Sequence, residues 1–297
     1  MNDIKIETIT SEDVFENNKV LYNTNNHWSA TGKAPDDYRK VLDKGLAKNW
    51  FHLKNDFVKT IDIDAKKHNW LLEANEIGLS TGKFPHAYDD ELDELLKEYD
   101  ESVSEFGEPL FVRTENVSLR FGQHGTGPYY NLKMVIQSLV SCVYTHTPFN
   151  KDDIGKSNDQ NENIIRLYLF KWNDKISKNI FSEYRVFIYN KNVTCISQQM
   201  LYTSNDVFKE NPHLAEKYAV CLIEYFNKNL KDNININSYT LDMAVINSDD
   251  DKQLNGYFIE VNSFGKDYAA GSSLFHWIID NNKLCSDGKT VWFRYTI

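Results

Sequence analysis

The spacing of apolar residues predicts helices and strands over most of the chain beyond residue 64. Helical periodicity is clearest over residues 87–105, where Leu92, Leu95, Leu96 and Tyr99 form a stripe among acidic residues. The predicted helices span residues 64–77, 87–105, 132–140, 212–230 and 272–280. Residues 1–60 show no comparable pattern, apart from a helix start with acidic residues at 36–42.

Short apolar runs between polar turns predict a set of strands. The predicted strands span residues 110–113, 164–171, 183–189, 193–199, 239–246, 257–262 and 290–296. Asn190-Lys191-Asn192 between two of them is typical of a hairpin turn, and residues 150–163 form a polar loop with little to bury. Antiparallel runs of strands with helices segregated between them indicate an α+β fold.

Composition and charge narrow the class of protein. The chain has 297 residues, of which 41% are hydrophobic, enough for one large domain or two lobes. Its mean hydropathy is −0.55 and no apolar run approaches the roughly 20 residues of a bilayer span, so we expect no membrane segment. Scattered cysteines without a CxxC pair and a polar start without a secretion signal indicate a cytoplasmic protein. A net charge of −10 argues against nucleic acid as a partner.

The segment Tyr257–Gly265 carries the most specific chemistry. Side chains two residues apart share a face of a strand, so Glu260 and Asn262 point to one side. Asp242 lies on the preceding predicted strand and offers a third oxygen ligand. Magnesium prefers such ligands together with nucleotide phosphates, so the pattern predicts a Mg–nucleotide site. The alternative is a polar cluster that caps a turn at the strand end.

Several motifs follow one another in an order that resembles the cell division cycle protein 123 family. They are Phe84-Pro85, Phe111-Val112-Arg113, Ser118-Leu119-Arg120, Leu169-Phe170-Lys171-Trp172, 182–188, Ile196-Ser197-Gln198, Leu241-Asp242, 258–265 and 273–277. The resemblance covers roughly residues 84–280. It implies an ATP-grasp-like fold, with two lobes whose antiparallel sheets enclose a nucleotide cleft. We therefore expect a region of unassigned role at 1–83 and a core at 84–297, with 111–180 as a lid-like lobe.

The resemblance also implies ATP and Mg²⁺ as cofactors and assigns roles to individual residues. The metal ligands would be Asp242, Glu260 and Asn262. The nucleotide-binding residues would be Arg113, Asn116, Ser118, Arg120, Lys171, Trp172, Asn173 and Ile176. Arg113 and Glu260 stand where the family has lysine and aspartate, and Phe170 where it usually has arginine. An acidic stretch that the family carries near its amino end is missing.

Each of these assignments has a structural alternative. Arg113 and Arg120 could be solvated charges on a glycine-rich surface loop, and Lys171 a strand end that emerges beside a core Trp172. Glu183 and Arg185 share a strand face, where they could form an ion pair. If Glu183 and Arg185 are instead the catalytic residues, Arg185 would face a γ-phosphate or a bound acceptor.

Three functions are compatible with the motifs. The resemblance implies an ATP·Mg-binding assembly chaperone for the gamma subunit of translation initiation factor 2, if the host is eukaryotic. An ATP-grasp ligase would phosphorylate a carboxylate and let an amine attack, which requires positioning and charge neutralisation. A ligase that joins nucleic-acid ends is the third hypothesis, but the chain is acidic and lacks a KxDG motif.

Overall fold

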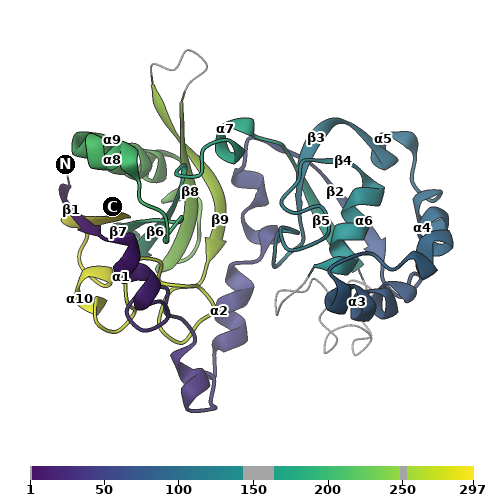
Figure 1. The fold of residues 1–297 in the computed structure, drawn as a ribbon, viewed down its shortest axis with the longest axis horizontal. Helices are drawn as coiled ribbons and strands as arrows, with labels where there is room; N and C mark the ends of the chain where they lie inside the picture. The colour runs from purple at the N-terminus through teal and green to yellow at the C-terminus, as the bar shows by residue number, and fades with distance from the viewer. Residues whose placement is uncertain (1, 143–163, 248–252) are drawn as a thin grey trace. The chain divides into compact units, whose positions relative to one another are not determined.

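The computed structural model describes residues 2–142, 164–247 and 253–297. The chain forms two compact units: unit 1 comprises residues 1–54 and 173–297, and unit 2 comprises residues 55–172 (Figure 1). Each unit is built on one β-sheet with helices packed against it, so the predicted α+β class is confirmed. The polar loop predicted at 150–163 and most of the turn predicted at 247–251 lie outside the described residues.

The unit boundaries differ from the predicted ones. We predicted a division between residues 83 and 84 and a lobe at 111–180, whereas the units meet at 54/55 and 172/173. Strand pairing explains the difference. β1 (Asp3–Ile9) pairs with β10 (Thr290–Thr296) in unit 1, whereas β2 (Phe57–Asp64) pairs with β5 (Ile164–Lys171) in unit 2. The first 83 residues are therefore shared between the two units.

Unit 1 contains a six-stranded sheet in the order β1-β10-β7-β6-β8-β9. Its remaining strands are β6 (Glu183–Tyr189), β7 (Asn192–Gln198), β8 (Tyr239–Asn247) and β9 (Leu254–Asn262). β10 runs parallel to both β1 and β7, so the sheet is mixed and not antiparallel as predicted. The connection from β9 to β10 spans residues 263–289, which is long enough for the crossover that parallel strands need.

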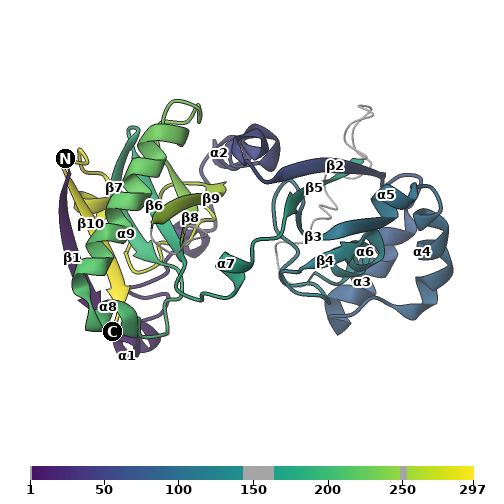
Figure 2. The ribbon, with the colours of Figure 1, turned by 90° about the horizontal axis from the view of Figure 1, so that it is seen from above.

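The two faces of this sheet are covered differently (Figure 2). α8 (Asp206–Glu210) and α9 (Pro212–Tyr225) lie on one face, where Phe208 and Tyr218 pack against Tyr184 of β6. A π-helical turn, Phe226–Leu230, continues α9, so the helix predicted at 212–230 is confirmed with a change of winding at its end. The other face is covered by the β9–β10 connection, which ends in α10 (Asn281–Leu284).

The helix predicted at 272–280 is wrong. Ser273 has a φ of 50°, which is outside the helical region, and the His276 ring nitrogen Nδ1 accepts hydrogen bonds from the backbone N–H groups of Ile278 and Ile279. The His276 side chain thus replaces backbone carbonyls as the acceptor for two N–H groups of this segment. The apolar spacing that suggested a helix reflects burial instead, because Leu274, Phe275 and Trp277 are all in the core.

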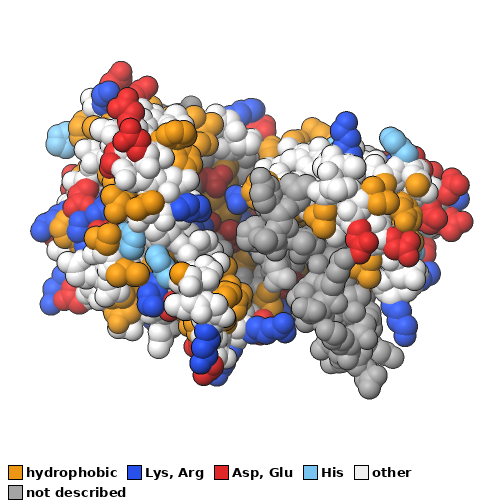
Figure 3. Space-filling model, turned by 60° about the horizontal axis from the view of Figure 1, so that its bottom comes forward, with side chains coloured by type: hydrophobic (Ala, Val, Ile, Leu, Met, Phe, Trp, Pro, Cys, Tyr) orange, Lys and Arg blue, Asp and Glu red, His pale blue; other side chains and the backbone are white. Residues whose placement is uncertain are grey.

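Unit 2 contains an antiparallel sheet in the order β2-β5-β3-β4, with β3 at Glu105–Arg113 and β4 at Tyr129–Asn131. Its helices are α3 (Trp70–Thr81), α4 (Asp89–Leu96), α5 (Glu101–Ser104) and α6 (Leu132–Ser141). The helix predicted at 132–140 is confirmed as α6. The long helix predicted at 87–105 is interrupted, because the Asp100 side chain accepts a hydrogen bond from Val103 N–H and caps a separate helix. Acidic side chains cover the exposed surface of this region (Figure 3).

The remaining elements of unit 1 come from the amino-terminal segment and from the start of the second segment. They are α1 (Ser11–Glu16), α2 (Tyr38–Lys44), three 3₁₀ turns at His27–Ala30, Ala47–Asn49 and Phe51–Leu53, and α7 (Asp174–Ser177). In unit 2 a further 3₁₀ turn, His86–Tyr88, precedes α4. The helix predicted at 64–77 is displaced to α3, because β2 extends to Asp64 and the Asp64 carboxylate accepts hydrogen bonds from Lys66 N–H and Lys67 N–H in the turn that follows.

Candidate functional site

One row of polar side chains crosses the whole sheet of unit 1, with one residue on each strand. In sheet order this polar row consists of Glu7, Arg294, Ser197, Arg185, Asp242 and Glu260. Each residue is the direct cross-strand partner of the next, and direct partners point to the same face of a sheet. The face is the one opposite α8 and α9. The two carboxylates Asp242 and Glu260 therefore lie side by side at the β9 end of the row.

Arg185 is bound to Asp242 in a bidentate ion pair. Its Nε lies 2.9 Å from Asp242 Oδ1 and its Nη2 lies 2.8 Å from Oδ2, while its Nη1 donates to the Gly271 carbonyl at 2.7 Å. The two side chains are only 13% and 9% exposed. The carboxylate that binds Arg185 in this bidentate manner is therefore Asp242, on the neighbouring strand. That geometry makes Arg185 a residue that orients Asp242.

Asn262 and Gln199 complete the surroundings of the two carboxylates. Asn262 Nδ2 donates to Asp242 Oδ2 at 3.3 Å and to Glu260 Oε1 at 3.2 Å. Gln199, directly after β7, donates from Nε2 to Asp242 Oδ1 at 2.7 Å. The structure therefore brings together Asp242, Glu260 and Asn262 as the period-2 pattern predicted. Gln199 was missed, and the only signal for it was its position after the Ile196-Ser197-Gln198 motif.

The electrostatics of this cluster suit a cation. Burial raises the pKa of the Asp242 carboxyl, and the adjacent Glu260 carboxyl raises it further, whereas the Arg185 guanidinium opposes both effects. Two neighbouring carboxylates and a carboxamide are hard oxygen ligands of the kind that Mg²⁺ uses together with phosphates and water. Within 2–142, 164–247 and 253–297, no group of three or more His, Cys, Asp or Glu side chains is placed to hold a metal ion. Asp242, Glu260 and Asn262 thus offer oxygen atoms from three side chains on one face of the sheet.

The amino-terminal segment, whose role we could not assign, supports the strand that carries two of these residues. Lys54 is buried, and its Nζ donates to the Phe258 carbonyl at 2.7 Å and to the Tyr257 hydroxyl at 3.0 Å. The Trp50 ring packs edge-on against the Phe258 ring. A Cβ atom on Gly45 would lie 3.3 Å from the Val261 carbonyl, so this turn fits closely against β9. Residues 45–54 therefore hold β9 in place.

In unit 2, four of the predicted nucleotide-binding residues lie in or beside one loop. Arg113 ends β3 and is 2% exposed, with Nε donating to the Thr114 carbonyl. Asn116 lies in the tight turn closed by Thr114 and Val117, and Ser118 forms an isolated bridge with Arg113. Arg120 is exposed, with its guanidinium over the Phe121 ring. Arg113, Asn116 and Ser118 are thus brought together, whereas Arg120 lies beyond them.

Lys171 and Trp172 lie at the other end of the same strand pair. Lys171 is opposite Leu110, and Tyr168 is opposite Arg113. Alternation along β5 therefore places Lys171 on the other face of the sheet from Tyr168 and Arg113. Trp172 N–H donates to the Pro109 carbonyl, and its ring lies against Gly127. The structure does not bring Lys171 and Arg113 onto one face.

The last three predicted residues lie at the start of the second segment of unit 1. Asn173 caps α7, accepting a hydrogen bond from Lys175 N–H on its side chain. The Ile176 carbonyl accepts a hydrogen bond from the Ser182 hydroxyl. Glu183 is exposed at the start of β6, two residues from Arg185. The first two residues have local structural roles, and the predicted roles of all three in binding or catalysis stay predictions.

Comparisons with known proteins support one family. No helix in the described part of the chain is long and apolar enough to cross a membrane. A search of curated proteins found no match. A structure of Cdc123 from Schizosaccharomyces pombe aligns with a TM-score of 0.56 and 15% identity, covering 86% of this chain and 97% of that one. A C-terminally truncated form of the same protein aligns with a TM-score of 0.53, the same identity and the same coverage.

These alignments show that the chain shares the fold of Cdc123, at an identity too low to transfer function. They span nearly the full length of both solved chains. A comparison of the sequence with family models gives a second line of evidence, which does not depend on the fold. Its match begins within α6 and ends with β10. The D123 family model matches residues 135–296, more than half of the 297 residues, and the chain therefore belongs to the D123 family, the family of Cdc123.

Proposed function

We propose that this protein binds ATP·Mg²⁺ through the carboxylate end of the polar row and acts as an assembly chaperone for the gamma subunit of translation initiation factor 2. The observation that carries the nucleotide part is the direct opposition of Asp242 and Glu260, with Asn262 beside both. Family membership supports the chaperone part by analogy. The proposal for the partner applies to a eukaryotic host.

In this proposal, Asp242, Glu260 and Asn262 would hold the ion, which would supply charge neutralisation for the phosphates. Arg185 and Gln199 keep the Asp242 carboxylate in one orientation through charge-assisted and neutral hydrogen bonds. Burial of Asp242 among these groups excludes water from one side of the carboxylate. A site of this kind would position the nucleotide and neutralise the charge of its phosphates. We assign none of its groups as a nucleophile.

The nucleotide part is tested by calorimetric titration of ATP with and without Mg²⁺. We expect Mg-dependent binding by the unaltered protein and its loss in Glu260→Gln. Glu7→Gln is the matched control, because it makes the same chemical change at the other end of the polar row. Equal ATP affinity in Glu260→Gln and the unaltered protein would overturn the site.

The chaperone part needs a separate experiment with the purified gamma subunit. We expect it to bind the full chain, more tightly with ATP·Mg²⁺ than without. Binding in neither condition would overturn the chaperone proposal and leave the nucleotide site standing. Release of ADP and phosphate when amino acids or peptides are added would instead identify an ATP-grasp ligase, and a covalent AMP adduct would identify a nucleic-acid end-joining enzyme.

A further inference from the structure

A short segment, Gly271–Asp280, runs across the polar row and forms hydrogen bonds with three residues of that row. We call this segment the strap. Arg185 Nη1 donates to the Gly271 carbonyl at 2.7 Å, Leu274 N–H donates to Ser197 Oγ at 3.0 Å, and Arg294 Nη1 donates to the Leu274 carbonyl at 3.0 Å. The peptide groups on both sides of Leu274 are therefore fixed by neighbouring strands. Leu274 is fully buried.

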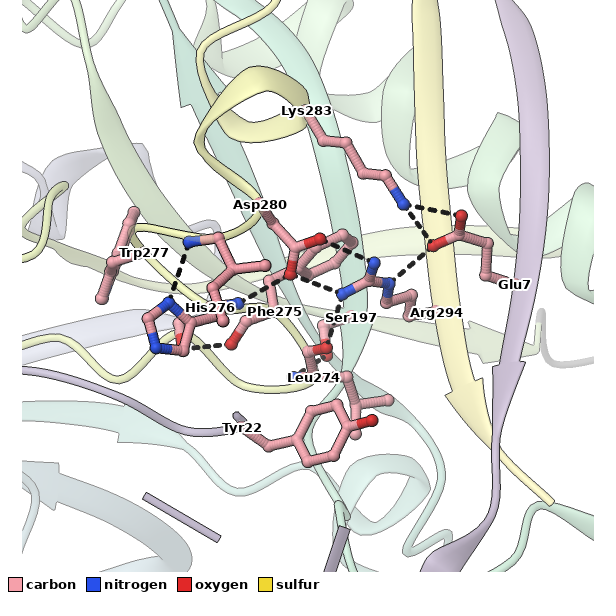
Figure 4. Close-up of polar contacts among 12 residues, drawn as sticks. Glu7, Tyr22, Ser197, Leu274, Phe275, His276, Trp277, Asp280, Lys283 and Arg294 are labelled. Atoms are coloured by element: carbon pink, nitrogen blue, oxygen red, sulfur yellow. Dashed lines mark hydrogen bonds and ion pairs between the residues drawn. The ribbon is translucent and has the colours of Figure 1, made fainter. Parts of the chain in front are cut away.

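The far end of the strap is fixed by a charge network around Arg294 (Figure 4). Arg294 binds Asp280 in a bidentate pair, with Nη1–Oδ2 at 2.7 Å and Nη2–Oδ1 at 2.8 Å. Its Nε donates to Glu7 at 2.7 Å, and Lys283 binds the same Glu7 carboxylate. Asp280 Oδ2 also accepts a hydrogen bond from His276 N–H. Asp280 thus joins the strap backbone to Arg294, whereas Glu7 lies on β1 and contacts Arg294 from the other side.

The near end of the strap has little freedom to move independently. Ser272 N–H donates to the Thr24 carbonyl at 3.0 Å, and Thr24 N–H donates to Ser272 Oγ at 2.9 Å. A Cβ atom on Gly271 would lie 2.4 Å from Asn23 Oδ1, so the strap fits closely against residues 23–24. Residues 23–24 therefore hold the near end of the strap beside Arg185, and the Leu274 peptide groups connect it to the end that Arg294 holds.

We propose that Arg294 and Asp280 are positioning residues for the candidate site. They fix the strap so that the Gly271 carbonyl holds one edge of the Arg185 guanidinium and directs its other edge at Asp242. The role in Mg–nucleotide binding rests on the proposed function. The orientation of Arg185 does not, because it is a property of the ligand-free protein. Partners that orient a metal ligand typically contribute about 10- to 100-fold in metal affinity.

The test compares Asp280→Asn with Glu7→Gln. Both variants remove a carboxylate charge from Arg294, but only Asp280 belongs to the strap. The first measurement is the ¹⁵N NMR signal of Arg185 Nε–H in the ligand-free protein, assigned by its absence in Arg185→Lys. We expect the signal to shift or broaden in Asp280→Asn and to stay in place in Glu7→Gln. The second measurement is the ATP·Mg²⁺ affinity, which we expect to fall about tenfold or more in Asp280→Asn and to change less than about twofold in Glu7→Gln.

The two measurements separate the two proposals. An unchanged Arg185 signal in Asp280→Asn would overturn the positioning role, whatever happens to nucleotide affinity. Equal changes in both variants would also overturn it, because they would indicate a general loss of the network. No binding of ATP·Mg²⁺ by the unaltered protein would overturn the proposed function, and the NMR comparison would still decide the orientation of Arg185. If Asp280→Asn does not fold, Ser197→Ala removes the acceptor of Leu274 N–H and must produce the same change of signal.

Discussion

Asp242 and Glu260 lie directly opposite each other on β8 and β9, and the carboxyl groups of the two are close enough to influence each other's protonation. Two like charges side by side, of which the one on Asp242 is buried, destabilise the ligand-free protein, and a divalent cation between them would reverse that effect. The opposition of Asp242 and Glu260 should therefore lower the stability of the ligand-free protein and favour binding of a divalent cation.

Replacing Glu260 with Gln removes the neighbouring charge from Asp242. We expect the ligand-free protein to become more stable by about 1 kcal/mol, or ~2–4 °C in Tm, because the repulsion disappears. The increase in Tm that ATP·Mg²⁺ gives the unaltered protein should be absent. Thermal unfolding with and without ATP·Mg²⁺ measures both effects. Glu216→Gln, at an exposed position on α9, is the control, and a lower Tm for ligand-free Glu260→Gln would contradict the prediction.

Replacing Arg185 with Lys keeps the positive charge and loses the planar fork. A lysine cannot bind both Asp242 oxygens and the Gly271 carbonyl at once, so buried acceptors lose their partners. We expect a loss of roughly 2–3 kcal/mol in the free energy of unfolding, measured by urea denaturation. Arg166→Lys is a suitable comparison, since its bidentate pair with Asp62 is exposed and should contribute less than about 1 kcal/mol. Equal losses at both positions would contradict the argument from burial.

The Glu7 carboxylate makes stability depend on pH in the acid range. Burial raises the pKa of Glu7, but hydrogen bonds from Lys283 and Arg294 outweigh it and hold the pKa below its ordinary value of 4.5. A carboxyl with a lowered pKa in the folded state stabilises the protein above its ordinary pKa and loses that contribution as the pH falls through the folded-state value. The difference in Tm between the unaltered protein and Glu7→Gln should therefore be constant above about pH 5.5 and shrink below pH 4.5. A difference that does not change between pH 6 and pH 3 would exclude Glu7 as the cause.

Tyr184 points into the core between the sheet of unit 1 and its helices. Its hydroxyl is one of the buried side-chain oxygens without a hydrogen-bond partner among the described residues. Removing an unsatisfied buried hydroxyl while keeping the ring is neutral or favourable, so Tyr184→Phe should raise the free energy of unfolding by up to about 1 kcal/mol. Tyr295→Phe is the control, because the Tyr295 hydroxyl donates to the Phe208 carbonyl and its loss should be destabilising. Chemical denaturation of the two variants should give shifts of opposite sign.

Local patterns predicted the central strands well because neighbouring residues determine them. The strands at 164–171, 183–189 and 290–296 have the predicted bounds. Asn190 and Lys191 both have positive φ, as a two-residue hairpin turn requires. The shared face of Glu260 and Asn262 followed from strand alternation alone. In each case the deciding information lies within a few residues.

Features that depend on distant segments could not be predicted in this way. β1 is a short strand that exists because it pairs with β10 at the other end of the chain. The strap has the apolar spacing of a helix, but buried polar partners on three strands determine its backbone. The strap contacts Arg185 and Arg294 only after the sheet has formed. No spacing of residues along the chain indicates these contacts. The roles of Arg113, Asn116, Ser118, Arg120, Lys171 and Trp172 in nucleotide binding stay predictions.

Unit 1 is assembled from both ends of the chain, with unit 2 inserted between them. During synthesis, residues 55–172 emerge from the ribosome as one continuous stretch, so unit 2 can fold co-translationally. The six-stranded sheet that carries Asp242 cannot be completed until β10 has been synthesised, because β10 lies between β1 and β7. Until then β1 and β7 lack the strand that joins them, and their open edges are exposed to other chains. The order of synthesis therefore favours folding of unit 2 before the sheet of unit 1 is complete.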